Sequence, residues 1–205
     1  MSDSLPMPVT APLTSAQRTQ LFNLVRRAAK AEIMPRFRKL GTHQIGEKTG
    51  PHDLVTEADT SAEAMITRGL QRFFPSAVIV GEEAASSNPD LVKKIPEAEL
   101  CFTIDPVDGT WNFAKGLPLF GVMVSVLRFG RPVFGLLYDP VLNDIVWADN
   151  EHPAQMQLPR RDSRFVNTDH DRNKPLDQLN GFVPLFLVPE EKRAEAAAAL
   201  PKFGR

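Results

Sequence analysis

The sequence predicts an α+β domain in which helices pack against a largely antiparallel sheet. Three apolar segments, 121–127, 132–138 and 145–148, follow one another with short turns between them, which is typical of an antiparallel meander. Two segments nearer the N-terminus, 21–33 and 65–74, instead carry apolar residues at helical spacing. Helices that precede a run of strands, rather than alternate with them, favour a layered α+β fold over a βαβ fold.

Length and composition limit the function classes. With 205 residues, 42% hydrophobic and 24% charged, the chain can bury a substantial core. Its 24 basic and 25 acidic residues leave a net charge of −1, so no overall field recruits nucleic acid or an anionic membrane. The single cysteine, Cys101, cannot form an intrachain disulfide, and no apolar run has the length of a membrane span. We therefore expect a globular cytoplasmic protein without nucleic-acid or membrane partners.

The positions of prolines, capping residues and hydrophobic periods predict three regions. Residues 1–13 contain three prolines and no period, so we expect a flexible leader. Residues 14–150 are expected to form an N-terminal α+β metal-binding domain, whose first helix begins near Thr14 or Ser15 because either can cap it. Residues 151–205 are expected to begin a second α/β half-domain.

Between the two predicted helices lies a segment that predicts a mobile loop. Residues 41–51 contain three glycines, Lys48 and no apolar period. The following helix is expected to have Asp59 or Thr60 as its N-cap. Asp53 lies too many residues before that helix to cap it, and it is next to the loop. Helix capping therefore does not explain why an aspartate occurs at position 53.

The most informative stretch is 100–110, where an apolar run stops on two carboxylates, Asp105 and Asp108. Pro106 lacks a backbone N–H, so we expect strand pairing to end by Asp105. Gly109 permits a tight turn, and Thr110 can start a helix whose free N–H groups attract a phosphate. Two carboxylates beside an anion repel it unless a hard cation such as Mg²⁺ lies between them. The stretch therefore predicts metal-assisted phosphoryl chemistry.

This stretch has two other interpretations. Asp-Pro and Asp-Gly are ordinary turn dipeptides, but their fusion behind an apolar strand favours a site. In haloacid dehalogenases the nucleophilic and acid/base aspartates lie two residues apart, on one side of an extended chain. Asp105 and Asp108 are three residues apart, so an aspartyl-phosphate mechanism fits this spacing poorly.

A second strand end repeats the arrangement. The short apolar segment 77–80 leads through Gly81 to the acidic pair Glu82 and Glu83. Paired acids usually form a solvated loop, but two strand ends that carry carboxylates favour a common site. The four histidines show no metal-ligand spacing, and no role for histidine is predicted.

Four motifs together resemble the inositol monophosphatase family of Mg²⁺-dependent, Li⁺-sensitive phosphatases. They occur in the family's order between residues 21 and 148, and the Asp-Pro-x-Asp-Gly-Thr signature is the most specific. The resemblance implies the layered helix and sheet fold shared with fructose bisphosphatases. The motifs are Asp53-Leu-Val-Thr56, Gly81-Glu-Glu83, Asp105-Pro-Val-Asp-Gly-Thr110 with Asn112-Phe113, and Gly135-Leu-Leu-Tyr-Asp-Pro140.

The resemblance implies a site for two or three Mg²⁺ ions. Glu82, Asp105 and the carbonyl of Val107 would hold one ion, and Asp105 with Asp108 would hold a second. The family's second signature, a Trp-Asp pair that adds a carboxylate to the second metal, has no counterpart here, since the tryptophans precede Asn112 and Ala148. We therefore expect the chain to end inside the family's C-terminal half-domain.

The resemblance also implies roles in catalysis. Gly109 and Thr110 would offer backbone N–H groups to the phosphate beside Asp108, while Glu82 and Thr110 would orient and deprotonate the attacking water. Asp53 would position Thr110. Two further residues would border the site: Lys48 and Glu83.

The predicted reaction is in-line attack of a metal-activated water on a small phosphorylated metabolite, without a covalent intermediate. Within the family, histidinol phosphate, a nucleotide bisphosphate or a sugar bisphosphate could replace inositol phosphate. A homodimer is expected for a full-length member. The alternative from another class is a catalytically impaired or regulatory member that keeps the fold and lacks the Trp-Asp ligand.

Overall fold

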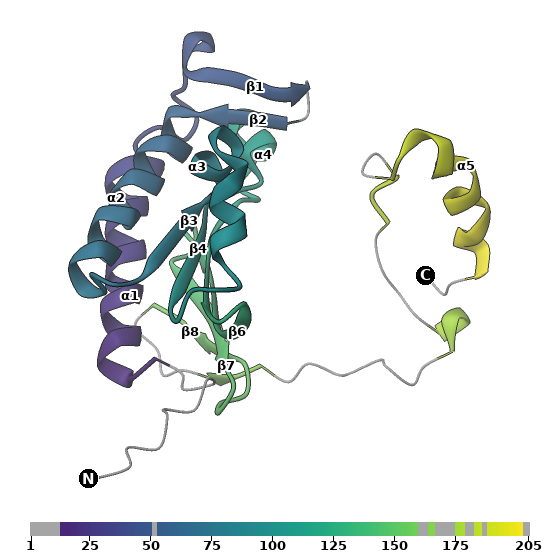
Figure 1. The fold of residues 1–205 in the computed structure, drawn as a ribbon. Coiled ribbons are helices and arrows are strands. Elements are labelled where there is room, and N and C mark those ends of the chain that lie inside the picture. Colours follow the sequence, from purple (N-terminus) through teal and green to yellow (C-terminus); the bar gives the residue numbers. More distant parts are fainter. Residues whose placement is uncertain are drawn as a thin grey trace, which may run out of the picture. The chain divides into compact units, whose positions relative to one another are not determined.

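The computed structural model describes residues 13–50, 53–159, 164–166, 175–178, 183–185 and 188–202. The chain divides into two compact units, residues 1–166 and 167–205 (Figure 1). The predicted site residues belong to the first unit. In the second unit, the helix α5 (Glu190–Ala199) begins with Glu190 and Glu191, whose charges favour the helix N-terminus.

The first unit is built on a seven-stranded sheet. Its strands follow the order β3-β4-β5-β6-β7-β8-β9, and every neighbouring pair is antiparallel except β3 and β4, which are parallel. The predicted meander and the α+β fold class are confirmed. The strands are β3 (Val78–Gly81), β4 (Cys101–Asp108), β5 (Gly121–Arg128), β6 (Arg131–Asp139), β7 (Asp144–Asp149), β8 (Gln155–Gln157) and β9 (Arg164–Phe165).

The first helix, α1 (Ser15–Ala28), begins where the capping pattern predicts. The Thr14 hydroxyl accepts a hydrogen bond from the N–H of Gln17, and the Gln17 side chain returns to the backbone of Thr14. The helix continues as a π-helical turn, Ala29–Ile33, and stops before Pro35, which cannot donate to the preceding turn.

The second helix, α2 (Glu57–Phe73), begins earlier than predicted. Its N-cap is Thr56, whose hydroxyl accepts from the N–H of Ala58, so Asp59 and Thr60 were the wrong candidates. Asp59 is instead the third helical residue and accepts the N–H of Thr56 at 2.9 Å. The start of α2 is therefore a capping box in which Asp59 contributes one carboxylate oxygen.

The predicted mobile loop at 41–51 is wrong for most of its length. A 3₁₀ turn, Thr42–Gln44, leads into strand β1 (Ile45–Gly50), which pairs antiparallel with β2 (Asp53–Thr56) in a separate hairpin. A polar strand with two glycines has little β propensity of its own. Its extended conformation depends on pairing with β2, which local patterns do not reveal.

Helices α1 and α2 lie side by side against one face of the sheet (Figure 1). They bury a core that includes Val25, Ile66 and Phe102, and Leu13 also joins it with 2% of its surface exposed. Burial of each such side chain stabilises the fold by about 1.5–3 kcal/mol. Among the described residues, no helix combines the length and apolarity needed to cross a membrane.

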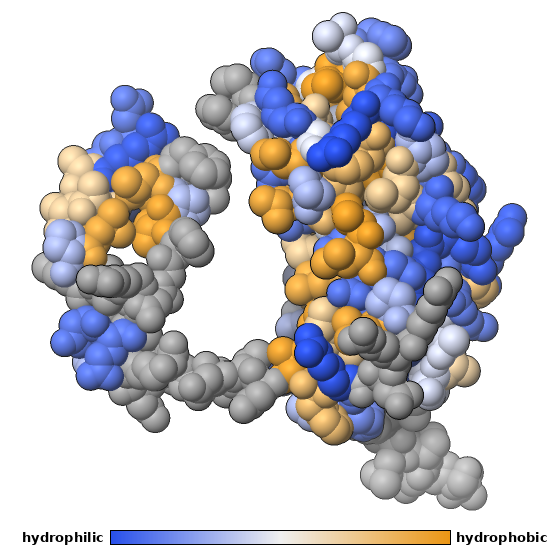
Figure 2. All heavy atoms as spheres, turned by 180° about the vertical axis from the view of Figure 1, so that it is seen from behind, coloured by the Kyte–Doolittle hydropathy of each residue, from blue (hydrophilic) through white to orange (hydrophobic). Residues whose placement is uncertain are grey.

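The opposite face of the sheet carries a small second core around Val80, Ala98 and Cys101 at one end. A row of paired residues crosses it from Asp105 through Met123, Leu137 and Val146 to Met156. This face borders a cavity of about 540 Å³ that also reaches Glu82 and Asp105. Figure 2 shows hydrophobic residues gathered in a band along the first unit. The carboxylates of the predicted site therefore lie at the rim of an apolar surface.

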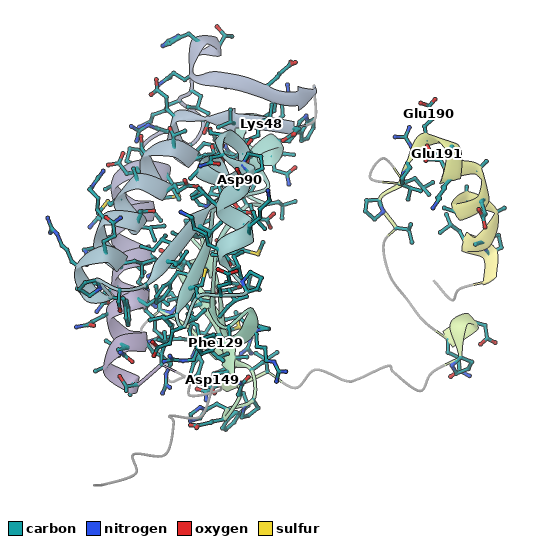
Figure 3. The ribbon with its side chains drawn as sticks, in the orientation of Figure 1. Lys48, Asp90, Phe129, Asp149, Glu190 and Glu191 are labelled. Atoms are coloured by element: carbon teal, nitrogen blue, oxygen red, sulfur yellow. The ribbon has the colours of Figure 1, made fainter. Side chains whose placement is uncertain are left out.

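Asp149, at the end of β7, ties α1 to the sheet far from Lys48 (Figure 3). Its fully buried side chain accepts Nη1 of Arg18 at 3.4 Å and the N–H of His152 at 2.7 Å, and the His152 ring Nδ1 lies 2.8 Å away. Burial by itself raises the pKa of Asp149. The hydrogen bonds from His152 and from the N–H of Glu151 outweigh burial and hold that pKa below its usual value.

We expect Asp149→Asn to lower the free energy of unfolding by about 1–3 kcal/mol at neutral pH, because the amide nitrogen that replaces one carboxylate oxygen cannot accept a hydrogen bond and Arg18 loses its anionic partner. A carboxyl with a lowered folded-state pKa stabilises the fold above its unfolded value, about 3.9. That contribution is lost as pH falls through the folded-state pKa. Urea unfolding of both proteins, from neutral pH to about pH 2, measures it. A stability difference that does not shrink in acid would contradict this assignment.

Candidate active site

The parallel pairing of β3 and β4 brings the two predicted carboxylate clusters together. In this register Gly81 lies opposite Ile104, so Glu82, the first residue after β3, lies beside Asp105, which continues β4. Glu82 opens the short helix α3 (Glu82–Ser87), and its side chain is 41% exposed. The carboxyl ends of parallel strands are a common location for ligand sites.

Strand β4 does not end at Asp105 as Pro106 predicts. Asp105 pairs with Met123 and Asp108 pairs with Gly121, with an irregularity between them. Between these two pairs β4 has one residue more than β5, so the pairing can continue past Pro106, which has no N–H to donate. The irregularity re-aims the side chains that follow Asp105, and it places Asp108 on the border of a second cavity of about 700 Å³.

Asp105 is the carboxylate of the cluster that has an unsatisfied buried oxygen and a strongly raised pKa. Its Oδ1 is buried and has no hydrogen-bond partner among the described residues. Burial first, then the adjacent Glu82 carboxylate and Asp108, raise the pKa of Asp105 well above its usual range. An orphaned oxygen among like charges is costly unless a proton or a cation neutralises it.

The turn after β4 requires glycine. Gly109 has a φ of +90°, and a Cβ there would come within 2.8 Å of the Leu119 carbonyl oxygen. The turn leads into the short helix α4 (Thr110–Ala114), whose Phe113 is buried in the core. The position of Thr110 is therefore set by a backbone turn on one side and by packing on the other.

The Thr110 hydroxyl lies between two acceptors. Its Oγ1 is 3.0 Å from Oδ1 of Asp59 and 3.0 Å from the carbonyl oxygen of Val107. Asp59 is completely buried, and burial raises its pKa despite hydrogen bonds from Thr56 and Thr110. Its two oxygens thus join the start of α2 to the residue after the Gly109 turn.

Sequence reasoning missed Asp59 as a site residue. It gave the role of positioning Thr110 to Asp53, but the carboxylate that the structure brings to the Thr110 hydroxyl is that of Asp59. Asp53 lies on β2 at the edge of the hairpin, and its role stays a prediction. The signal in the sequence was the start of α2. If Thr56 is the N-cap, one carboxylate oxygen of Asp59 completes the capping box, and the other oxygen can accept a further hydrogen bond.

Lys48 forms ion pairs with both glutamates of the cluster. Its Nζ lies 2.8 Å from Oε1 of Glu82 and 2.8 Å from Oε1 of Glu83. Burial lowers the pKa of Lys48, but its hydrogen bonds to both glutamates outweigh burial and hold that pKa well above the usual value. Lys48 therefore partly neutralises the glutamates and links the β1–β2 hairpin to α3.

The donor set fits a hard cation. Carboxylate oxygens of Glu82, Asp105 and Asp108 and the carbonyl of Val107 are the ligand type that Mg²⁺ prefers. The orphaned Oδ1 of Asp105 provides one free ligand atom. Among the described residues, no three His, Cys, Asp or Glu side chains already converge as a metal cluster. The assignment of metal ligands therefore stays a prediction.

Comparison with known proteins identifies relatives of this chain. The model of the inositol monophosphatase family matches residues 15–177. Inositol-1-monophosphatase of Synechocystis is 34% identical over 188 residues, which cover 84% of this chain and 61% of that protein. Nus factor SuhB of Vibrio cholerae is 30% identical over 179 residues, which cover 84% of this chain and 60% of that protein.

Solved structures share the fold. An inositol monophosphatase from Zymomonas mobilis superposes with a TM-score of 0.66 at 23% identity, covering 93% of this chain and 68% of that one. An IMPase/NADP phosphatase complexed with Mg²⁺ and phosphate superposes with a TM-score of 0.54 at 22% identity, covering 67% of this chain and 51% of that one.

The chain spans between 38% and 61% of the length of the curated relatives it matches. The family match nevertheless covers most of the chain, from α1 to beyond β9. The superposition on a solved inositol monophosphatase agrees with that match. This chain belongs to the inositol monophosphatase family.

Proposed function

We propose that this protein is a Mg²⁺-dependent phosphate-monoester hydrolase. The observation that carries the proposal is the meeting of Glu82 and Asp105 at one sheet edge, with the Thr110–Asp59 pair at the end of β4. Carboxylates for a metal, a half-buried hydroxyl with its acceptor and a glycine turn are the parts that water-mediated phosphoryl transfer requires. The substrate class is a small phosphorylated metabolite.

Each part has a distinct task in this proposal. The backbone N–H groups of Gly109 and Thr110 bind phosphate oxygens where the Gly109 turn exposes them. The Thr110 hydroxyl accepts a hydrogen bond from the attacking water while it donates to Asp59. Glu82 takes the water's proton, and Asp59 holds the hydroxyl in one orientation. Water then attacks phosphorus in line with the leaving alkoxide, and no covalent intermediate forms.

Mg²⁺, when bound, supplies positive charge to the phosphoryl oxygens and lowers the pKa of the attacking water. Glu82, Asp105 and the Val107 carbonyl would hold one ion, and Asp105 with Asp108 a second. The IMPase/NADP phosphatase of the same fold is complexed with Mg²⁺ and phosphate, which supports this cofactor. Asp105 and Asp108 are the two ligands assigned to the second ion, one fewer than for the first, so we expect weaker second-site binding and activity that depends steeply on Mg²⁺.

A regulatory role is the second candidate. A relative whose match covers 84% of this chain is named a Nus factor rather than a phosphatase. A regulatory member would keep the fold and the core while hydrolysing no phosphate monoester. The two candidates therefore differ in turnover and not in structure.

Phosphate release from a substrate panel tests the proposal. The panel contains inositol 1-phosphate, histidinol phosphate, fructose 1,6-bisphosphate and a nucleotide 3′,5′-bisphosphate, each titrated with Mg²⁺. We expect Mg²⁺-dependent, Li⁺-inhibited turnover of at least one compound, which increases when the C-terminal segment of a relative is fused to this chain. Absence of turnover in both forms, with the protein folded, would favour the regulatory candidate.

A further inference from the structure

Glu63 is a buried carboxylate to which the predicted site assigns no role. It lies one turn after Asp59 on α2 and is 7% exposed. Its Oε2 accepts the N–H of Glu83 at 2.8 Å, and its Oε1 accepts the N–H of Ala84 at 3.0 Å. Both donors belong to the first turn of α3, whose N–H groups have no partner within the helix. Glu63 therefore caps α3 from another helix.

Gly81 makes this capping possible. It is the N-cap of α3, and its φ of −87° is one that any residue can adopt. A Cβ at this position, however, would lie 2.1 Å from Cδ of Glu63 and 2.3 and 2.4 Å from its two oxygens. The absent side chain of Gly81 thus leaves the space that the Glu63 carboxylate fills. The requirement for glycine here is one of space and not of backbone conformation.

The same helix supports both halves of the site. Asp59 reaches from α2 to Thr110, after the end of β4, and Glu63 reaches from α2 to α3, after the end of β3. Two residues four positions apart project from the same side of a helix, with their Cβ atoms about 5–6 Å from one another. A rigid α2 therefore sets the spacing between Thr110 and the first turn of α3, which begins with Glu82.

We propose that Glu63 is a positioning residue for the metal site, an inference that rests on the proposed function. By capping α3 it fixes the backbone of Glu82 and Glu83 relative to Asp105. The N-cap residue of this six-residue helix, Gly81, has no side chain that could replace the cap. Without the cap, the first turn would fray, and Glu82 would move relative to Asp105. Glu63 acts through the backbone of α3 and does not touch substrate or metal.

Calorimetric titration of Mg²⁺ into the protein tests the role of Glu63. Glu63→Gln keeps the size of the side chain, but its amide nitrogen cannot accept a hydrogen bond. We expect the Kd for Mg²⁺ to rise about 10- to 100-fold, the usual effect of residues that orient metal ligands. The Mg²⁺ concentration for half-maximal activity should rise by the same factor. Glu57→Gln, an exposed glutamate of α2 that contacts Gln44, is the matched control and should leave both unchanged.

Gly81→Ala gives a second, independent test, and it keeps the inference falsifiable if Glu63→Gln does not fold. The added methyl group should displace the Glu63 carboxylate and weaken Mg²⁺ binding to a similar degree. In a Glu63→Ala background the same change meets no carboxylate, so it should weaken Mg²⁺ binding no further. Additive losses would show that the two residues act separately and would overturn the inference.

The outcomes separate this inference from the proposed function. A wild-type protein that binds no Mg²⁺ overturns both. A wild-type protein that binds Mg²⁺, together with a folded Glu63→Gln protein that binds it equally well, overturns only the role of Glu63. Lower thermal stability with unchanged Mg²⁺ affinity would identify Glu63 as a structural cap alone.

Discussion

Asp105→Asn is expected to abolish Mg²⁺ binding and phosphatase activity while the protein stays folded. Asp105 lies beside Glu82 and Asp108, and its buried Oδ1 has no partner among the described residues. It is the one carboxylate assigned to both metals. Asparagine keeps the shape but removes the charge that attracts a hard cation. We expect kcat/KM to fall at least about 10³-fold, equivalent to about 4 kcal/mol.

Calorimetry with Mg²⁺ and thermal unfolding check the Asp105 prediction on the same samples. Thermal stability of the metal-free protein should not fall, because asparagine removes a buried charge from a cluster of like charges. Asp90→Asn is the control: Asp90 is an exposed aspartate paired with Lys93 (Figure 3). An Asp105→Asn protein with wild-type Mg²⁺ affinity would remove this residue from the site.

Thr110→Ala is expected to lower kcat by about 10²- to 10⁴-fold with a smaller change in KM. The substitution keeps the backbone N–H offered to phosphate but removes the hydroxyl that lies 3.0 Å from Asp59. Thr110→Ser should retain much of the activity, since it keeps the hydroxyl. Thr60→Ala removes an exposed hydroxyl on α2 and serves as the control. A raised KM with unchanged kcat would assign Thr110 to binding alone.

A double-mutant cycle identifies the partner of Thr110. If Asp59 orients the hydroxyl, Asp59→Asn should lower kcat in the wild type and have little further effect in a Thr110→Ala background. The same cycle with Asp53→Asn tests the role predicted from sequence. Coupling of Thr110 to Asp53, and not to Asp59, would restore the original assignment. Steady-state kinetics of the variants measure both couplings.

The sequence by itself determined the features whose cause is local. The capping pattern at Thr14 placed the start of α1, because a cap involves residues within three positions of one another. Alternation and turns predicted the meander of β5, β6 and β7. Two strands that stop on acidic residues pointed to a shared site, and the β3–β4 pairing brings Glu82 and Asp105 to one edge.

Only the tertiary structure decided the contacts that join distant segments. The hydrogen bond of Thr110 to Asp59 spans 51 residues, and that of Glu63 to the N–H of Glu83 spans 20. Strand β1, which carries Lys48, is extended because it pairs with β2 and not because of its own residues. Capping motifs and hydrophobic periods report only on neighbours within a few positions. Which carboxylate orients a catalytic hydroxyl depends instead on how α2 packs against the end of β4, and packing is a property of the whole fold.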